Sequence, residues 1–298
     1  MKLIEIGERN YLLYRVLPHA LKMALLSRES RARLDRINSR VNEHVVSGDR
    51  ATEYERIHRY EDDAQHEYPV RLLVTEVWSA PGRGAGEGGY GRVLELGAGS
   101  GYFTALIARR ARTVIAAEPV ADLRRVVRER CAAERLDNVE VIGATAFDLG
   151  GEVPAGSIDS AFIIQSLHHF HRRPEVFAEL GRAVRPGGRL YLVEPHHNVR
   201  RVARLAGKYR RVYRAREFWT DERHWATHDF VTRGELRALC RHGGFGNVRI
   251  EAYWIPYSRR LIPAAERRFR VERMLGRVPL VRHVGAVLAM QARRKSHE

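Results

Sequence analysis

The sequence predicts an α/β fold: a Rossmann-like, seven-stranded, mostly parallel sheet with helices on both faces. Two observations predict this class. From residue 92 onward, short apolar runs alternate with stretches of helix length, and a glycine-rich turn joins the first run to the first stretch. Residues 1–80 instead repeat apolar side chains at helical spacing. We therefore expect a helical lid over 1–80, a glycine-rich linker over 81–91 and an α/β domain over 92–298.

The strands of the α/β domain are expected where short apolar runs lie between turn residues. These runs fall at 93–96, 113–117, 139–142, 160–164, 189–193, 247–254 and 284–292. Helices are expected at 103–110, 120–135, 174–184 and 232–242, with lid helices near 12–41 and 68–78. Basic insertions at 196–230 and 256–283 interrupt the alternation and are expected to form caps. In sheets of this kind, ligands bind beyond the carboxyl ends of the strands.

The composition combines a normal core with an unusual charge. The hydrophobic fraction is 44%, which is enough for a full core, and the formal net charge is +16. This charge comes from 52 Lys and Arg residues against 36 Asp and Glu residues. A positive field attracts nucleic acid, anionic lipid head groups or acidic small molecules, and by itself it does not select among them.

The two cysteines, Cys131 and Cys240, lie far apart and lack the spacing of metal ligands. This pattern argues against a disulfide scaffold, a zinc site and an iron–sulfur site, and no metal is predicted. It is typical of a reducing cytoplasm. The first residues lack a signal-peptide pattern, and charges interrupt the apolar stretch at 11–26. We therefore expect a cytoplasmic protein without a transmembrane segment.

The glycine-rich turn has the pattern Glu95-Leu-Gly97-Ala-Gly99-Ser-Gly101. Glycines at the junction of a strand and a helix let the backbone approach a ligand closely. The dinucleotide-binding fingerprint would require glycine at position 102, where this chain has tyrosine, and no phosphate-binding P-loop motif is present. Glu118 follows at the end of the next predicted strand.

These motifs, with the segment 163–170 and the turn 182–188, resemble those of the class I S-adenosylmethionine-dependent methyltransferase family. The resemblance implies S-adenosyl-L-methionine as cofactor and S-adenosyl-L-homocysteine as product. It implies that the glycine loop binds the methionine portion, that Glu118 binds both ribose hydroxyls and that Pro119 lines the adenine pocket. Thr145 stands where the family has an adenine-binding aspartate. The implied cofactor-binding residues are Glu95, Gly97, Ala98, Gly99, Gly101, Glu118, Pro119, Thr145, Ala146 and Gln165.

A methyltransferase that acts on oxygen needs a base near the methyl group, at the end of the fourth strand. His168, in the run Leu-His-His-Phe, is the candidate base because histidine titrates near neutral pH. Such a run also occurs as packing and helix capping, so a structural role for His168 stays open. The motif Asn/Asp-Pro-Pro-Tyr/Phe of base-amino methyltransferases is absent, and neither cysteine lies at a strand end, which argues against nucleobase carbon methylation.

The two insertions bear on the acceptor. Residues 200–216 hold eight basic side chains and no acid, interleaved with aromatic residues. This pattern fits a cap that grips an anionic acceptor, an RNA-binding surface, or a solvated helix face. The insertion at 256–283 is amphipathic and basic, which fits either peripheral contact with an anionic membrane or a helix packed on the core.

The expected activity is therefore O-methylation of a small-molecule, natural-product or glycan intermediate. The alternatives are an RNA methyltransferase and a non-catalytic, cofactor-binding partner subunit. The lid would supply acceptor specificity through residues such as Tyr54, Tyr60, His66 and Tyr68.

Overall fold

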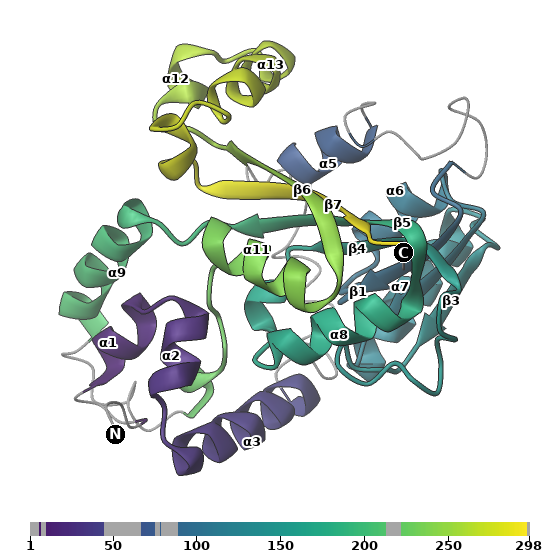
Figure 1. The fold of residues 1–298 in the computed structure, drawn as a ribbon, viewed down its shortest axis with the longest axis horizontal. Coiled ribbons are helices and arrows are strands. Elements are labelled where there is room, and N and C mark those ends of the chain that lie inside the picture. Colours follow the sequence, from purple (N-terminus) through teal and green to yellow (C-terminus); the bar gives the residue numbers. More distant parts are fainter. Residues whose placement is uncertain are drawn as a thin grey trace.

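A computed structural model describes residues 6, 10–44, 67–74, 78, 89–212 and 222–296. Its centre is a seven-stranded sheet with the order β3-β2-β1-β4-β5-β7-β6 (Figure 1). Neighbouring strands are parallel except at β7, which is antiparallel to both β5 and β6. The predicted Rossmann-like fold is confirmed. The strands are β1 (Arg92–Leu96), β2 (Thr113–Ala117), β3 (Val139–Ile142), β4 (Ile158–Ile164), β5 (Val184–Pro195), β6 (Phe245–Tyr253) and β7 (Val287–Arg294).

Most strand boundaries agree with the sequence prediction, and β2 and β3 agree residue for residue. The strand β5 starts earlier than predicted. Val184 pairs with Ile158 of β4, and the next pair is Arg189 with Ser160. Residues 185–188, which belong to the expected turn, lie between these two pairs as an irregularity within β5, and Gly187 has a φ of +78°. The strand β7 starts later, because its first residue to pair with β5 and β6 is Val287.

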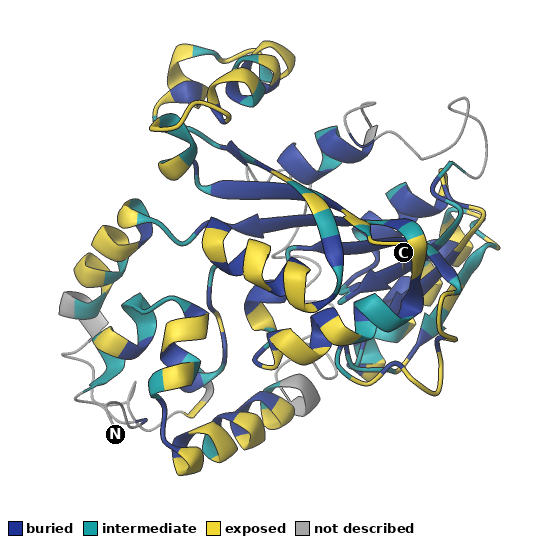
Figure 2. Cartoon of the chain, in the orientation of Figure 1, coloured by how far each residue is buried: buried dark blue, intermediate teal, exposed yellow. Residues whose placement is uncertain are grey.

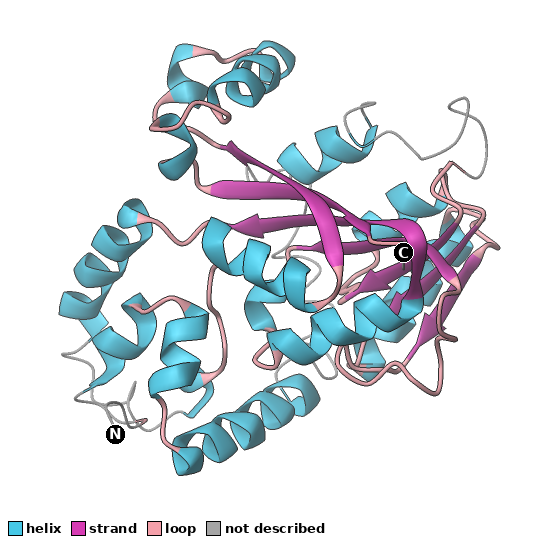
Figure 3. Ribbon diagram, viewed as in Figure 1, coloured by secondary structure: helices cyan, strands magenta, loops and turns pink. Residues whose placement is uncertain are grey.

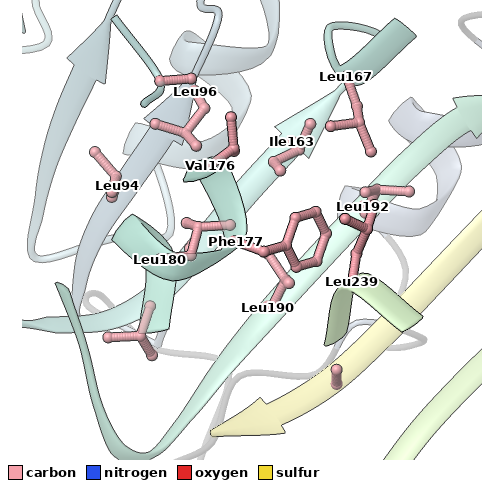
Figure 4. Packing of buried hydrophobic residues seen from close by; sticks show 14 of the residues in the cluster. Leu94, Leu96, Ile163, Leu167, Val176, Phe177, Leu180, Leu190, Leu192 and Leu239 are labelled. Atoms are coloured by element: carbon pink, nitrogen blue, oxygen red, sulfur yellow. The ribbon is translucent and has the colours of Figure 1, made fainter. Parts of the chain in front are cut away.

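Helices cover both faces of the sheet (Figure 3). One face packs against α8 and α11, and Phe177 of α8 lies among the leucines of β1 and β5 (Figure 4). The other face packs against α5 and α6. Along β4, Phe162 and Ile163 belong to the clusters on opposite faces, as the two-residue repeat of a strand requires. The helices around the sheet are α5 (Glu67–Val74), α6 (Tyr102–Ala108), α7 (Ala121–Ala133), α8 (Arg173–Ala183) and α11 (Arg233–His242).

The described N-terminal helices form a cap at one end of the molecule (Figure 1). They pack against the first insertion, where the hydroxyl of Tyr14 donates a hydrogen bond to the carbonyl of Trp225 at 2.7 Å. The elements of this cap are α1 (Tyr11–Val16), α2 (His19–Leu25), α3 (Arg28–His44), α9 (Val199–Val212) and η4 (Glu222–Trp225).

The described parts of the predicted lid pack in two places, since α5 belongs to the sheet rather than to the cap. Tyr68 of α5 is fully buried against Tyr253 of β6, so it does not face a substrate cavity. The other lid residues proposed for specificity, Tyr54, Tyr60 and His66, lie outside the described residues, as does most of the linker.

The second insertion forms an extension beyond the ends of β6 and β7 (Figure 1). Part of it packs on the core, because Phe269 is buried against Tyr253. The remainder leaves large apolar side chains such as Leu261 and Met274 exposed (Figure 2). No helix among the described residues combines the length and apolarity needed to cross a membrane. The elements are α12 (Ser258–Leu261), α13 (Ala265–Leu275) and η5 (Val281–His283).

Candidate active site

The predicted site residues lie at the carboxyl ends of β1, β2, β3 and β4. The strand order reverses between β1 and β4, and such a switch point is where open α/β sheets bind ligands. The hydroxyl of Ser166, just after β4, donates a hydrogen bond to the carbonyl of Leu96 at 2.7 Å. This hydrogen bond connects the glycine loop to the segment that carries His168.

Two glycines of the loop are required for steric reasons. Gly97 has a φ of +73°, and a Cβ added to it would lie 2.6 Å from the Cβ of Ser166. Gly101 has a φ of +76° at the start of α6, and a Cβ there would lie 3.1 Å from the Cα of Val127. The loop is therefore held tightly between the end of β4 and the helix α7, with its backbone open to close approach by a ligand.

Glu118 lies at the end of β2, directly beside the loop. Its Oε2 accepts a hydrogen bond from the backbone N–H of Gly99 at 2.9 Å, and its Oε1 accepts one from Val120 at 3.0 Å. Burial raises the pKa of Glu118, while these two hydrogen bonds act in the opposite direction. The carboxylate has further acceptor capacity, so it can also receive hydrogen bonds from two ligand hydroxyls.

Glu95 is buried behind the loop, where its Oε2 accepts a hydrogen bond from the hydroxyl of Thr104 on α6 at 2.6 Å. Burial raises the pKa of Glu95 to about 7, although the hydrogen bond from Thr104 opposes this shift. This hydrogen bond makes Glu95 a link between β1 and α6, behind the glycine loop.

The raised pKa of Glu95 predicts a pH-dependent stability. An unfolded glutamate titrates near pH ~4.3, so between that pH and about 7 the folded protein retains a proton that the unfolded chain has lost. Stability of the natural protein should therefore fall across this window relative to Glu95→Gln. The difference in stability is measured by the melting temperatures of both proteins from about pH 4.5 to about pH 8. A difference that stays constant with pH would contradict the prediction.

The remaining predicted cofactor residues occupy different environments. Pro119 and Thr145, which follow β2 and β3, are half-buried. Ala98 is buried against α7, and Ala146 is buried in the main core cluster, so both side chains contribute to packing. Among the described residues, no hydrogen bond joins Thr145 to Glu118.

Gln165 gives the clearest sign of an additional ligand. It adopts a φ of +56° at the end of β4, an uncommon conformation for a residue other than glycine. Its side-chain Nε2 is buried and has no hydrogen-bond partner in the described part of the chain. Buried amide nitrogens normally have acceptors, so this atom suits a polar group of a bound molecule. Together with the open loop and Glu118, it fits the predicted cofactor.

His168 is held by an acid that the sequence reasoning missed. Its Nδ1 lies 2.7 Å from Oε2 of Glu194, which is fully buried near the end of β5. The other carboxylate oxygen accepts hydrogen bonds from the backbone N–H groups of Ser166 and Leu167, at 2.7 and 2.6 Å. A carboxylate only accepts, so Nδ1 donates and Nε2 is the basic nitrogen of His168.

Two further histidines surround this one. His168, His169 and His228 each offer a ring nitrogen within 4.8 Å of the others, and they are the candidate metal-ligand cluster among the described residues. Desolvation, followed by repulsion from His168 and Arg201, lowers the pKa of His228 and keeps it neutral. The sequence predicts no metal, and the arginine and lysine side chains that line the adjoining cavity disfavour a bound cation.

A cavity of about 500 Å³ adjoins this cluster. Its walls come from the cap and from the segment between η4 and α11. The volume is in the range of small-molecule sites. The side chains that line it include His169, His228, Tyr11, Tyr209, Leu12, Val41, Leu205, Phe230, Arg15, Arg200, Arg201, Arg204 and Lys208.

A buried charged cluster attaches the cap beside the histidines. Asp229 receives a hydrogen bond from His19 of α2 at 2.8 Å and forms an ion pair with Lys22. The guanidinium of Arg173 donates to the backbone carbonyl of Asp229, and the backbone N–H of Asp229 donates to the carbonyl of His168 at 2.8 Å. The position of the cap is thereby coupled to the backbone of the candidate base.

Sequence comparisons place a known domain at this site. Residues 94–192 match the family described as a methyltransferase domain. The chain is 40% identical over 76 residues to a protein-L-isoaspartate O-methyltransferase of Nitrobacter winogradskyi, covering 26% of this chain and 34% of that protein. It is 33% identical over 104 residues to an uncharacterized methyltransferase of Mycobacterium bovis, covering 34% and 39%. The chain thus spans little more than a third of the length of these relatives.

Solved structures share the fold at low identity. An S-adenosylmethionine-dependent methyltransferase of Thermotoga maritima superposes with a TM-score of 0.51 at 19% identity, over 82% of this chain and 95% of that one. The geranyl diphosphate C-methyltransferase of Streptomyces coelicolor, solved with S-adenosyl-L-homocysteine, gives 0.51 at 13% identity, over 78% and 85%. Residues 94–192 therefore match a methyltransferase domain, and the chain shares its fold with S-adenosylmethionine-dependent methyltransferases of known structure.

Proposed function

We propose that this chain transfers a methyl group from S-adenosyl-L-methionine to a hydroxyl group of a small-molecule, natural-product or glycan acceptor. The observation that carries the proposal is the pair formed by His168 and Glu194, at the same sheet edge as the glycine loop. The ring of His168 contacts those of His169 and His228, which line the cavity. An oriented imidazole next to a substrate-sized cavity is the arrangement that deprotonation of a hydroxyl requires.

The cofactor would be held by the glycine loop, by Glu118 through the ribose hydroxyls and by the amide of Gln165. When bound, S-adenosylmethionine supplies a methyl group that is already activated. The chain therefore has two tasks, to position the acceptor oxygen and to remove its proton.

His168 would remove that proton with Nε2 while Nδ1 donates to Glu194. The carboxylate fixes the tautomer and stabilises the imidazolium that forms, as in other carboxylate–histidine pairs. The hydrogen bonds from Ser166 and Leu167 hold Glu194 itself, so the acid keeps its place while the histidine changes charge.

Cofactor binding is tested first, by isothermal titration calorimetry with S-adenosylhomocysteine. Glu118→Gln should weaken binding about 10- to 100-fold, because hydrogen bonds to a charged group contribute about 1.5–3 kcal/mol. Glu134→Gln, which changes an acid that pairs with Arg109 at the surface, is the matched control and should bind normally. If the natural protein binds neither S-adenosylmethionine nor S-adenosylhomocysteine, the proposed function is refuted.

Methyl transfer is tested next with the cofactor-competent protein, on a panel of hydroxylated small molecules, glycans and single-stranded RNA. Turnover on a small hydroxylated compound supports the proposal. Transfer to RNA alone, with activity that falls steeply with salt, would favour the RNA alternative. Cofactor binding without transfer to any member of the panel would favour the non-catalytic partner subunit.

A further inference from the structure

The cavity beside the histidines is strongly cationic on one side. Arg200, Arg204 and Lys208 follow one another at intervals of four residues along α9, so they lie on one face of that helix, and Arg201 lies beside them. Arg15 of α1 lines the same space. These basic side chains together form a positively charged wall of the cavity.

Two of these arginines are fixed in place by the protein. Arg200 donates hydrogen bonds to the carbonyls of Val284 and Trp254, at 2.9 and 3.3 Å. Arg201 is buried, donates to the carbonyl of His228 at 2.9 Å, and lies 3.3 Å from the centroid of the Phe230 ring. The buried Nε of Arg201 has no hydrogen-bond partner among the described residues. A donor held this way is available to an acceptor group of a ligand.

None of the described residues that line the cavity is an aspartate or glutamate. The two described acids near this segment have partners of their own, because Glu222 pairs with Arg33 at 2.8 Å and Asp229 pairs with Lys22. Burial lowers the pKa of Arg201 to about 10; the attraction of Asp229 opposes this shift, while the neighbouring arginines add to it. The arginines remain charged and repel one another.

The cavity also has an apolar lining. Leu12, Val41 and Leu205 line it together with the rings of Tyr11 and Tyr209, whose centroids are 6.4 Å apart. Their planes are inclined by only 19°. A ligand that binds both the basic and the apolar side chains would combine an anionic group with an apolar or ring-shaped body.

We propose that the acceptor is a phosphate monoester whose phosphate is held by Arg200, Arg201, Arg204 and Lys208 and whose apolar body lies against the apolar side chains of the cavity. This assignment rests on the proposed function, since it names the acceptor class for that activity. A phosphate monoester carries close to two negative charges at neutral pH, and arginine forks bind its oxygens in a bidentate manner. A carboxylate carries only one negative charge, so it would leave most of the positive charge of these four side chains unbalanced. The far end of the acceptor would then reach the histidines.

The test is isothermal titration calorimetry of the full-length chain with 1-naphthyl phosphate, without cofactor, at low salt. The matched neutral probe is 1-naphthol, which keeps the ring and lacks the phosphate. We expect the phosphate compound to bind at least about 10-fold more tightly than the alcohol. We expect Arg204→Gln and Lys208→Gln each to weaken it by about 10-fold or more. Both residues are exposed on α9, so these changes should leave the fold intact.

Arg270→Gln is the control for net charge, because Arg270 is an exposed residue of α13 that does not line the cavity. Equal effects of Arg204→Gln and Arg270→Gln, or equal affinity for naphthol and naphthyl phosphate, would overturn the proposal. So would displacement of naphthyl phosphate by a single-stranded RNA oligonucleotide that binds more tightly, since the phosphate recognised would then be that of RNA.

These measurements separate this inference from the proposed function. Normal binding of S-adenosylhomocysteine with no specific binding of naphthyl phosphate would overturn the phosphate assignment alone. Specific binding of naphthyl phosphate without any binding of the nucleosides would refute the methyltransferase proposal and leave an anion site.

Discussion

Replacement of His168 by alanine is expected to lower the rate of methyl transfer about 10²- to 10⁴-fold, the usual contribution of a general base. The affinity for S-adenosylhomocysteine should stay within about 3-fold, because no described contact joins the imidazole to the glycine loop, and a change of that size is under ~1 kcal/mol. Single-turnover rates with the acceptor identified by the screen would measure the first effect, and calorimetry the second.

Glu194→Gln should also lower the rate, because an amide can present its N–H₂ group to Nδ1 and favour the wrong tautomer of His168. The variant His242→Ala, which removes a histidine from the outer surface of α11, serves as the control. A rate for His168→Ala within a few-fold of the natural protein would leave His168 as a packing residue and would require another base.

Replacement of Asp229 by alanine is expected to destabilise the protein by about 3–5 kcal/mol, the typical cost of removing one partner of a buried ion pair. Asp229 is 2% exposed, and Lys22 is fully buried, so the ammonium group would lose its counter-charge without gaining water. Although burial opposes ionisation, Lys22 and His19 hold the pKa of Asp229 well below its usual range. The stabilising effect is therefore complete above pH ~4 and is lost as the pH falls through that lowered pKa.

Urea unfolding followed by circular dichroism at pH 7 would measure this loss. Arg33→Ala is the control, because it breaks an ion pair with Glu222 in which both side chains are about 40% or more exposed. Exposed pairs contribute about 0–1 kcal/mol, so the control should differ little from the natural protein. A loss below ~1 kcal/mol for Asp229→Ala would mean that the buried cluster relaxes or admits water.

The fold and the cofactor loop were predictable because their signals are local. Alternating apolar runs gave the boundaries of β2 and β3, and the spacing of Gly97 and Gly101 defined a turn whose positive φ angles only glycine adopts readily. The early start of β5 was missed, because Val184 pairs with Ile158 of β4 before the Pro-Gly-Gly sequence is reached. The turn signal itself is reflected in the irregularity at residues 185–188, where Gly187 has a positive φ.

The proposed partner of His168 and the cavity proposed for the acceptor depend on contacts between distant segments. Glu194 stands at the end of an apolar strand, as Glu118 does, and the same rule applied to β5 would have singled it out. The cavity has no comparable signal, because Arg15 and Arg204 meet only after the N-terminal helices fold onto α9. Sequence also could not distinguish Tyr68, a core residue, from residues that face a substrate.

The cap also imposes an order on folding during synthesis. Tyr14 and His19 find their partners at Trp225 and Asp229, 211 and 210 residues later in the chain. At a translation rate of about 5–20 residues per second, the first cap helices emerge ~10–40 s before the segment that buries them. Throughout that interval, Tyr14, Leu34 and Ile37 lack the Trp225 side of their cluster. The N-terminal helices therefore cannot complete their packing until the segment with Trp225 and Asp229 has been synthesised.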